Sequence, residues 1–510
     1  MGIEAITITI EVNVSMGQGY HIVGLPDSAI KESLDRTESA IKANGFHMPR
    51  TKVLVNLSPA DLRKTGAAFD LPIAIGLIAA SEQLASILPL DKILIMGELG
   101  LDGLLYPIKG VLAMAIKAQE EGLSALLLPL QNVQEASMID GIPIYGFTHL
   151  TEVVHFLKTG NKHAVQYSTV HFKSNSASTE KKLPLLEDIK GQFHCKRAMA
   201  IASAGGHNLI MIGPPGAGKT MLAKSIVSIL PPLSMEEAIQ TTQIYSVVNK
   251  GLNINTLMYN RPFRQPHHTI SNIAMIGGGN TPQPGEISLA HNGVLFLDEL
   301  PEFNRNVIEV LRQPMEEGVV HIARAKISLS FPAQFILLAS MNPCPCGYYN
   351  HPTKDCYCSA TAIQKYLHKI SGPLLDRIDL HVEVAPVAYD QLQETNLAGS
   401  SKDIAKLVLA ARAIQKHRFS GETGIFTNAQ MTGAHLMRYC KADQAAKDLL
   451  KHAMDKFQLS ARAHDRIIKV ARTIADLSNT SNIQAIHMSE AIQYRCLDKS
   501  SWGKYKDGSN

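Results

Sequence analysis

Residues 208–228 read NLIMIGPPGAGKTMLAKSIVS, and this stretch decides the fold of the chain. Within it GPPGAGKT, residues 213–220, matches the pattern G-x-x-x-x-G-K-[ST] at every fixed position. An apolar run precedes the pattern and a helix-forming segment follows it, so the sequence predicts a strand, a loop and a helix. A loop in this context cradles phosphate groups with backbone N–H groups at the start of the helix.

The loop predicts a nucleotide site that takes ATP and Mg²⁺. We expect the Lys219 ammonium to reach the β and γ phosphates and the Thr220 hydroxyl to bind Mg²⁺. A glycine-rich turn without a ligand is the alternative, which the flanking strand and helix disfavour. The loop residues are Gly213, Pro214, Pro215, Gly216, Ala217, Gly218, Lys219 and Thr220.

Composition limits the classes of protein to which the chain can belong. Its 510 residues suffice for about three domains, and 45% hydrophobic with 18% charged residues is typical of a globular protein. There is no run of about 18 apolar residues and no signal-peptide pattern, so we expect a cytoplasmic protein without a membrane partner. Its seven cysteines should then be reduced, which favours metal or core roles. The net charge of +4 is too small to indicate a nucleic-acid partner without local basic patches.

Two changes in sequence pattern divide the chain into three domains. Residues 161–182 lack apolar periodicity and have a Ser/Asn/Lys-rich middle, which is typical of an exposed linker. Near residues 390–402 a strand-like segment gives way to long helical patterns. We expect an N-terminal domain over 1–160, an α/β nucleotide-binding core with a parallel sheet over 183–390, and a C-terminal helical lid over 395–500.

A second strand of the core ends in two acidic residues. GVLFL, residues 293–297, is apolar throughout, as in a buried parallel strand, and Asp298 and Glu299 follow it. Carboxylates at the carboxyl end of such a strand face the crevice in which open α/β sheets bind ligands. We expect Asp298 to hold Mg²⁺ through water and Glu299 to act on the attacking water. An acidic pair that only caps the strand is the alternative.

Two polar residues later in the core each have two possible roles. Asn342 follows the strand-like run FILLASM, and its side chain either contacts the γ-phosphate and the attacking water or serves only in a turn. Arg377 lies in LLDRIDL, residues 374–380. Its guanidinium either pairs with Asp376 or Asp379, or reaches the nucleotide of a neighbouring subunit. Spacing alone does not choose between these roles.

The order of these motifs resembles that of AAA+ ATPases, in the branch that includes magnesium-chelatase subunits and minichromosome-maintenance helicases. Longer phrases resemble one family within it, the ComM/YifB family of magnesium-chelatase-like proteins. These phrases are PFRQPHHTIS (262–271), IGGGNTPQPGEISLAHNGVLFLDEL (276–300), EVLRQPMEEG (309–318) and MNPCPCGYY (341–349). The resemblance covers almost the whole chain, from VGLPDSAIKES (23–33) to SARAHDRIIKVARTIADL (460–477).

The resemblance implies a hexameric, ATP-driven DNA helicase that promotes branch migration during recombination of incoming DNA. It also implies that Asn342 is the first sensor, Arg377 the arginine finger that acts in trans, and Arg462 the second sensor, on the lid. Arg462 begins a predicted helix whose apolar face includes Ile467 and Ala471, which would leave its guanidinium free toward the nucleotide. A surface arginine at a helix start is the alternative.

Two insertions in the core are candidates for contact with DNA. Residues 262–286 contain three consecutive glycines and several prolines, so we expect a loop or hairpin, and such insertions in related rings point into the central pore. A second hairpin is predicted with arms over 319–322 and 326–330. Arg324 and Lys326 at its tip would hold DNA phosphates, or else form a solvated tip.

Four cysteines follow the spacing C-x-C-x9-C-x-C in an insert over 344–358. They offer four thiolates to a tetrahedral Zn²⁺ ion. Free thiols in an inserted loop are the alternative, because the spacing is tighter than the common C-x2-C. The four residues are Cys344, Cys346, Cys356 and Cys358. The remaining cysteines, Cys195, Cys440 and Cys496, are isolated and are expected to serve in packing.

The N-terminal domain is similar over residues 55–79 and 95–122 to the ribosomal-S5-like α+β fold of Lon-type serine-lysine proteases. Protease chemistry needs a serine nucleophile and a lysine base. The tight turn reads Gly66-Ala67-Ala68-Phe69, so Lys109 and Lys117 have no serine to activate. We expect a scaffold or DNA-contacting collar without the catalytic dyad. Relatives usually have several residues before the start MGIEA that form a first strand, whose loss would weaken this domain.

Three functions are compatible with these residues. A DNA motor, assembled as a homo-hexamer and working with recombination proteins, is favoured by the complete ATPase set beside basic hairpins. A chelatase-type motor that drives metal insertion into a tetrapyrrole would need a porphyrin-binding partner that this chain does not contain. The third is a non-enzymatic, nucleotide-gated adaptor for recombination proteins. ATPase turnover separates the adaptor from the motors.

Overall fold

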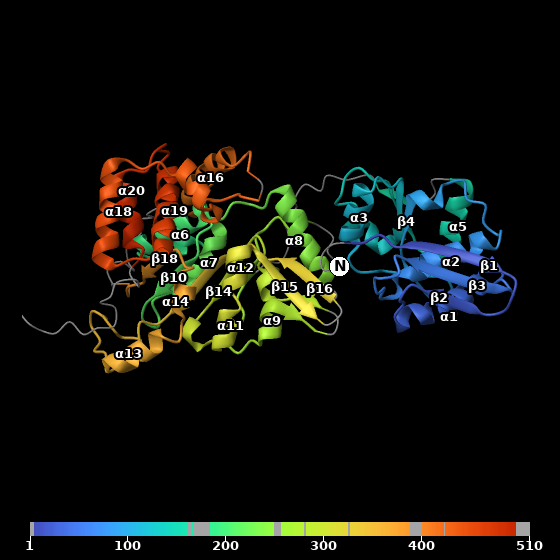
Figure 1. The fold of residues 1–510 in the computed structure, drawn as a ribbon, viewed down its shortest axis with the longest axis horizontal. Coiled ribbons are helices and arrows are strands. Elements are labelled where there is room, and N and C mark those ends of the chain that lie inside the picture. Colours follow the sequence, from blue (N-terminus) through green and yellow to red (C-terminus); the bar gives the residue numbers. More distant parts are fainter. Residues whose placement is uncertain are drawn as a thin grey trace, which may run out of the picture. The chain divides into compact units, whose positions relative to one another are not determined.

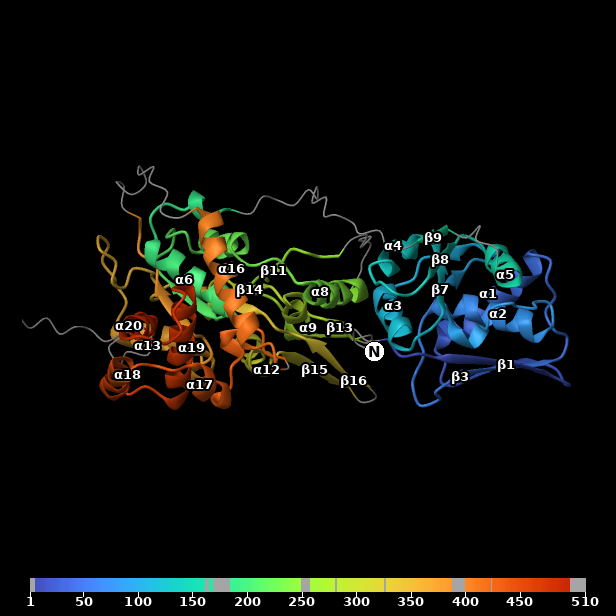
Figure 2. The ribbon, with the colours of Figure 1, turned by 90° about the horizontal axis from the view of Figure 1, so that it is seen from above.

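The structure is a computed structural model that describes residues 5–160, 165–167, 184–248, 257–279, 282–324, 327–387, 400–422 and 424–495. The chain divides into two units (Figures 1 and 2). Unit 1 consists of Met1–Ala177 and Thr242–Met258, and unit 2 consists of Ser178–Thr241 and Tyr259–Asn510. The phosphate loop and all the other candidate site residues belong to unit 2.

A five-stranded parallel sheet forms the centre of unit 2, in the order β11-β14-β17-β10-β18. Except in β11 and at the last residue of β18, every residue of these strands is buried, as their apolar sequences predict. The predicted α/β core with a parallel sheet is confirmed. The strands are β10 (Leu209–Ile212), β11 (Phe263–Arg264), β14 (Val294–Leu297), β17 (Ile336–Met341) and β18 (Leu380–Glu383).

The C-terminal helices share one hydrophobic core with this sheet. Helix α6 (Phe193–Gly205) contacts β18, and it also contacts α16 (Ser401–Arg418) and α19 (Ala461–Leu477). Ile467 and Ala471 of α19 are buried in the same cluster as strand residues of β10, β14 and β17. The predicted inward face of α19 is therefore confirmed. The remaining helices here are α17 (Gly433–Tyr439), α18 (Gln444–Phe457) and α20 (Ala485–Gln493).

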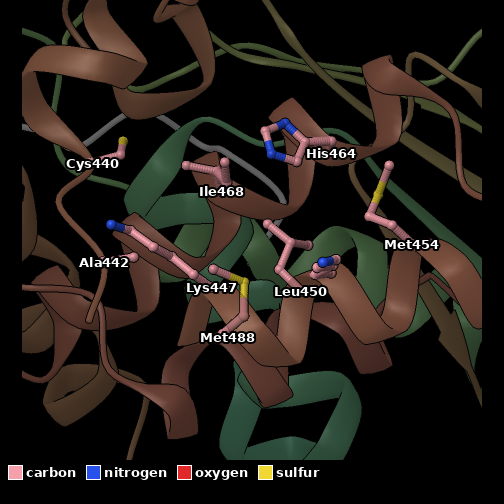
Figure 3. Close-up of a pocket in the computed structure, with 9 residues that line it drawn as sticks. Cys440, Ala442, Lys447, Leu450, Met454, His464, Ile468 and Met488 are labelled. Atoms are coloured by element: carbon pink, nitrogen blue, oxygen red, sulfur yellow. The ribbon is translucent and has the colours of Figure 1, made fainter. Parts of the chain in front are cut away.

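A pocket of about 430 Å³ lies within these C-terminal helices (Figure 3). Burial raises the pKa of the Cys440 thiol in its wall to about 12, so this thiol stays uncharged near neutral pH. The pocket is distinct from the phosphate loop. Its lining residues are Cys440, Ala442, Lys447, Leu450, Lys451, Met454, His464, Ile468 and Met488.

Two hairpins are inserted into the core and contact each other. The first pairs β12 (Gly277–Gly278) with β13 (Gln283–Pro284), and the second pairs β15 (Val319–Arg324) with β16 (Ile327–Pro332). A Cβ atom placed on Gly277 would lie 3.1 Å from Cδ1 of Ile322 in β15. Both views show β15 and β16 at the end of unit 2 opposite to α18.

The hairpin predicted over 319–330 is confirmed, with longer arms than expected. The segment over 262–286 contains a hairpin, β12–β13, as expected, and it also contains β11 and one short helix, α9. The short helices of this region are α9 (Asn272–Ile276), α10 (Glu286–Leu289), α11 (Arg305–Glu309) and α12 (Arg312–Glu317). The others in unit 2 are α7 (Lys219–Ser225), α13 (Ala360–Leu367) and α14 (Gly372–Leu375), while α8 (Met235–Val248) spans the division between the units.

Unit 1 has the expected α+β class. Arg36 of α1 forms a bidentate ion pair with the buried Asp70 at the start of α2, at 2.8 and 3.0 Å. Its sheets are ordered β1-β3-β2 and β4-β7-β8-β9, beside a hairpin of β5 and β6. The strands are β1 (Thr9–Ser15), β2 (Tyr20–Val23), β3 (Lys52–Ser58), β4 (Ile93–Ile95), β5 (Glu98–Leu99), β6 (Leu105–Tyr106), β7 (Ala125–Pro129), β8 (Ile144–Phe147) and β9 (Val165–Tyr167). The helices are α1 (Ser28–Ala43), α2 (Asp70–Ala80), α3 (Val111–Glu120), α4 (Val133–Ala136) and α5 (Leu150–Thr159).

The borders of unit 1 differ in two places from the predicted domains. Val165–Tyr167, inside the predicted linker 161–182, form β9 and pair antiparallel with β8, which satisfies backbone groups at the sheet edge. This part of the predicted linker therefore extends the sheet of unit 1. Residues 242–258, predicted within the nucleotide-binding core, group with unit 1 as well. None of the helices that the structure describes combines the length and the apolar character needed to cross a membrane.

Asp476 of α19 joins the buried Arg472 to the partly buried Arg418 of α16. Its carboxylate accepts from Arg472 at 3.1 Å and from Arg418 of α16 at 2.5 and 2.7 Å. Asn428 also donates to it, at 2.8 Å. Arg472 and Asp476 are only 1% and 2% exposed, so each charge depends on its partner.

We expect Asp476→Ala to destabilise unit 2 by about 3–5 kcal/mol, because it leaves the buried Arg472 guanidinium, beside the partly buried Arg418, without a carboxylate. The midpoint of urea unfolding, followed by circular dichroism, measures the effect. Asp448→Ala, on the exposed surface of α18, is the matched control and should change stability by less than about 0.5 kcal/mol. Equal midpoints for the two variants would contradict the expectation.

Candidate nucleotide-binding site

The parallel register brings the predicted site residues to one edge of the sheet. Strand β17 pairs with β10 on one side and with β14 on the other. The phosphate loop follows β10, Asp298 follows β14 and Asn342 follows β17, so all three emerge side by side. The chain order of the strands reverses at β10, and open α/β sheets bind ligands at such a switch point.

The loop has the backbone conformation that a phosphate site needs. Gly216 and Gly218 have φ angles of +80° and +83°, which favour glycine, and a Cβ atom on either would meet nothing within 4 Å. A Cβ atom on Gly213 would instead lie 2.3 Å from the carbonyl oxygen of Val384. Helix α7 begins after Gly218 without a side-chain cap, so its first N–H groups can bind an anion.

Lys219 lies at the mouth of this loop. Its Nζ donates to the carbonyl oxygens of Gly213 and Pro214, at 2.6 and 2.9 Å, and to Oδ1 of Asn342 at 3.0 Å. Burial lowers the pKa of the ammonium, and the charges of Asp298 and Glu299 oppose this shift. The structure thus brings Lys219 and Asn342 into direct contact, which spacing in the sequence alone could not establish.

Asp298 accepts hydrogen bonds from two hydroxyl groups. Thr220 Oγ1 donates to Asp298 Oδ2 at 2.8 Å, and Ser340 Oγ donates to Oδ1. Hydroxyl and carboxylate oxygens are the ligands that Mg²⁺ prefers, directly or through water. Thr220 and Asp298 therefore lie as a Mg²⁺ site requires.

Glu299 follows Asp298 in an unusual backbone conformation. Its φ is +56°, in the left-handed region that residues with a side chain seldom occupy, and its side chain is exposed. The Glu299 N–H donates to Ser340 Oγ at 3.2 Å, which holds this conformation. Backbone strain of this kind is concentrated at functional sites.

Ser340 is a site residue that the sequence analysis does not identify. It is fully buried in β17 and contacts both acidic residues that follow β14. It lies two residues before Asn342, so both side chains point to the same face of the strand. A single hydroxyl in an otherwise apolar strand, in phase with Asn342, is the signal that could have found it.

Arg377 lies outside this cluster. Its side chain is 7% exposed and forms an ion pair with Glu316 of α12, and its Nη1 donates to the carbonyl oxygen of Pro373 at 2.5 Å. Among the described residues neither Asp376 nor Asp379 forms an ion pair with Arg377. The alternative in which Arg377 pairs with one of these acidic neighbours is therefore wrong. Arg377 borders a groove of about 520 Å³ that is also lined by α12 and the start of β15.

Asp379 connects the segment after Arg377 to the lid. Arg466 of α19 donates to Asp379 Oδ1 at 2.5 Å and to the carbonyl oxygen of Arg377 at 3.1 Å. The Asn208 N–H, just before β10, donates to Asp379 Oδ2 at 3.0 Å. Burial opposes ionisation of Asp379, but the charge of Arg466 and the contact with His207 outweigh burial and hold its pKa well below the usual range.

Arg462 lies one turn before Arg466 on α19. Ser460 caps this helix by accepting from the Ala463 N–H at 3.2 Å. The Arg462 side chain is exposed and forms no hydrogen bond or ion pair with any described residue. The structure thus places Arg462 at the start of the lid helix, and its sensor role stays a prediction.

The structure describes the other predicted residues in part. The four cysteine sulfur atoms lie within 4.8 Å of one another. Arg324 ends β15, but its side chain and the whole of Lys326 lie outside the described part of the chain. The DNA contacts expected of both residues stay predictions.

Family models match three consecutive parts of the chain. The model described as "Subunit ChlI of Mg-chelatase" matches residues 10–132, and "Magnesium chelatase, subunit ChlI" matches residues 185–392. "Magnesium chelatase, subunit ChlI C-terminal" matches residues 398–495. The last two matches cover the sheet with its phosphate loop and the C-terminal helices.

Relatives match nearly the full chain. "Competence protein ComM" of Haemophilus influenzae is 43% identical over 98% of this chain and 96% of its own length. The chain belongs to the ComM/YifB family of magnesium-chelatase-like proteins. YifB of Escherichia coli is 41% identical over the same shares, whereas magnesium-chelatase subunit ChlI-2 of Arabidopsis thaliana is 24% identical over 36% of the chain. As a ComM/YifB protein with an AAA+-like core, the chain is an AAA+-type ATPase.

The residues at the sheet edge fit Mg²⁺–ATP. The open backbone at Gly216 and Gly218 and the uncapped start of α7 suit phosphate oxygens, and the oxygens of Thr220 and Asp298 suit the metal. When bound, Mg²⁺–ATP supplies the phosphoryl group that is transferred to water. Lys219, from the loop after β10, and Asn342, which follows β17, would then orient this phosphoryl group.

We expect Lys219→Ala to weaken Mg²⁺–ATP binding by about tenfold or more, because it removes a charged hydrogen bond to the phosphates. Isothermal titration calorimetry measures the Kd. Lys224→Ala, on the same helix, is the matched control and should change the Kd by less than about twofold. Similar affinities for the two variants would show that the loop does not hold the nucleotide in this way.

Proposed function

We propose that this AAA+-type ATPase is a DNA motor, which as a homo-hexamer drives branch migration of recombining DNA. The observation that carries the proposal is the pair of contacting hairpins, β12–β13 and β15–β16, inserted into the ATPase core. In the sequence, β15 ends at Arg324 and is followed at once by Ala325-Lys326 before β16 begins, and two such basic residues suit contact with phosphates. A relative that matches nearly the full chain is competence protein ComM, and a role in competence agrees with the handling of incoming DNA.

The second hairpin is connected at one end to the helix that pairs with Arg377 and at the other end to the strand that leads to Asn342. Helix α12, which carries Glu316, ends at Glu317 and is capped by Gly318 with a φ of +67°, and β15 begins at the next residue, Val319. At its other end, β16 finishes at Pro332 and β17, which leads to Asn342, begins at Ile336. A change at either Arg377 or Asn342 can therefore move the hairpin, and with it the bound DNA.

The need for a neighbouring subunit follows from the charges at the site. Asp298 and Glu299 receive no hydrogen bond from any arginine in the described ranges, and Lys219 is the cation beside them. Phosphoryl transfer needs further positive charge around the γ-phosphate. We infer that Arg377 of the next subunit supplies it, after leaving Glu316, while Arg462 acts from the lid.

Within one subunit, Thr220 and Asp298 would hold Mg²⁺, Glu299 would polarise the attacking water and Asn342 would position it. The exposed carboxylate of Glu299 and the contact of Asn342 with Lys219 support these roles. Recombination proteins are the partners that such a motor would meet on branched DNA.

Two other functions receive less support. A chelatase-type motor agrees with the family name, but the match to a named magnesium-chelatase subunit covers 36% of this chain, against 98% for ComM. A nucleotide-gated adaptor for recombination proteins would bind ATP without turnover. Glu299, exposed and strained at the strand end, is more useful to an enzyme that hydrolyses ATP than to such an adaptor.

The ATPase rate without DNA, with single-stranded DNA and with a branched junction tests the motor. We expect the junction to stimulate hydrolysis several-fold. In the double variant Arg324→Ala/Lys326→Ala the stimulation should be lost while the rate without DNA is kept, and the salt dependence of DNA binding should fall by about 1 to 2 in slope.

The matched control for this experiment is Lys447→Ala/Lys451→Ala, which removes the same charge from α18 and should keep the stimulation. Hydrolysis by the unaltered chain that is indifferent to every DNA would contradict the motor. A complete lack of hydrolysis would select the adaptor instead.

Mixing Arg377→Ala subunits with Glu299→Gln subunits tests the composite site. Each variant alone should lose most ATPase activity while Mg²⁺–ATP binding is kept, because one lacks the arginine and the other lacks the carboxylate that polarises water. In the mixture, a site with an intact Glu299 can receive Arg377 from a neighbouring Glu299→Gln subunit, so activity should return. Glu316→Ala, which removes the ion-pair partner of Arg377 but keeps the arginine, is the control and should stay active without mixing. A mixture no more active than the two variants measured separately would exclude action in trans.

A further inference from the structure

The four cysteines of the 344–358 insert converge on one point. Cys344 follows β17 almost directly and is buried, and the other three are half-buried. The Sγ atom of Cys344 lies 3.3 Å from that of Cys346 and 3.7 Å from that of Cys356. The Sγ atoms of Cys346 and Cys356 are 3.6 Å apart, and Cys358 completes a group within 4.8 Å.

These separations are those of a tetrahedral site. Four sulfur atoms at about 2.3 Å from a central Zn²⁺ lie about 3.8 Å from one another. All four cysteines are free thiols rather than disulfide partners. An iron–sulfur cluster also takes four cysteines, but it holds their sulfur atoms apart across the cluster, whereas these four suit one ion.

The backbone of the insert supports the same geometry. Gly347, which follows the first C-x-C pair, has a φ of +84°, so the chain turns back beneath Cys344. The Tyr349 N–H donates to Cys344 Sγ at 3.3 Å, and such a bond stabilises a thiolate that binds a metal. The second C-x-C pair, Cys356 and Cys358, then returns to the same point from the other end of the insert.

The insert packs directly on the phosphate loop. A Cβ atom placed on Gly347 would lie 2.6 Å from Cδ of Pro215 and 3.9 Å from Cγ of Asn342. Helix α13, which begins two residues after Cys358, brings Tyr366 to the same place. Burial raises the pKa of Tyr366 to about 12, and a hydrogen bond with the Asn342 backbone opposes this rise. Elements on both sides of the insert thus contact the nucleotide site.

We propose that Cys344, Cys346, Cys356 and Cys358 bind one structural Zn²⁺ ion, which fixes the insert against Pro215 and Asn342 and so holds the nucleotide site in shape. The ion replaces a hydrophobic core that an insert of this length cannot form, as in other small zinc sites. The first part of the proposal is independent of DNA. The second part rests on the nucleotide site, but not on motor activity.

Metal analysis of the purified full-length chain tests the first part. We expect about one zinc per chain, and loss of nearly all of it in Cys346→Ser/Cys356→Ser, since a closed structural site needs four ligands. Cys440→Ser, whose thiol lies in the pocket of the C-terminal helices, is the matched control and should keep the zinc. Zinc retained by the double variant, zinc absent from the unaltered chain after expression with added zinc, or iron in its place would each overturn the proposal.

A second measurement covers the case in which the double variant does not fold. Treatment of the unaltered chain with a thiol-binding mercurial, in the presence of a zinc-sensitive dye, should release about one zinc per chain. The absorption spectrum of the chain prepared with cobalt(II) should show tetrahedral thiolate coordination. The absence of either signal would count against the site.

Nucleotide affinity without DNA tests the second part. Removal of zinc should weaken Mg²⁺–ATP binding by about tenfold, because Pro215 and Asn342 lose their support, and added Zn²⁺ should restore it. Unchanged affinity in the folded, zinc-free chain would refute the positioning role while leaving the metal site in place. Because no DNA is present, this outcome is separable from failure of the proposed motor.

Discussion

The parallel pairing of β17 with β10 and β14 is the constraint on which the site depends. It brings the ends of three strands to one edge, where the phosphate loop, Asp298 and Asn342 become neighbours although they are far apart in the sequence. The contacts of Ser340 depend on this register, because its buried hydroxyl contacts both the Asp298 carboxylate and the Glu299 backbone. A shift of β17 by one residue would turn Ser340 and Asn342 to the opposite face and disconnect them from Lys219.

Sequence patterns predicted those parts of unit 2 in which local chemistry decides the structure. The phosphate loop, the apolar strands and the inward face of α19 follow from residue types and periodicity, and the structure agrees with them. Contacts between distant segments could not be predicted in this way. The partner of Arg377 proved to be Glu316, more than fifty residues away, rather than its own acidic neighbours, and Asp379 pairs with Arg466 of the lid. These pairings depend on how α12 and α19 pack in the fold, and local sequence patterns do not predict that packing.

The charges around Asp379 connect the lid to the strand that carries the loop. This buried carboxylate accepts from Arg466 of α19 and from the backbone before β10, and Arg466 also reaches the carbonyl oxygen of Arg377. One ionised group therefore links the lid helix, the start of the loop strand and the segment of the proposed trans arginine. Because a buried carboxylate is stable only with its partners, these three elements are constrained to keep their contacts together.

The hydrophobic core that the lid shares with the sheet limits how the lid can move. Ile467 and Ala471 of α19 pack in one continuous cluster with Leu209 and Phe296 of the strands, and α6 contacts both groups of elements. A hinge that swung α19 away would expose this cluster to water, which is costly. Packed helices can instead slide past one another by small shear steps that keep their apolar surfaces covered. The geometry of unit 2 thus favours short, stiff displacements of the C-terminal helices over wide opening and closing.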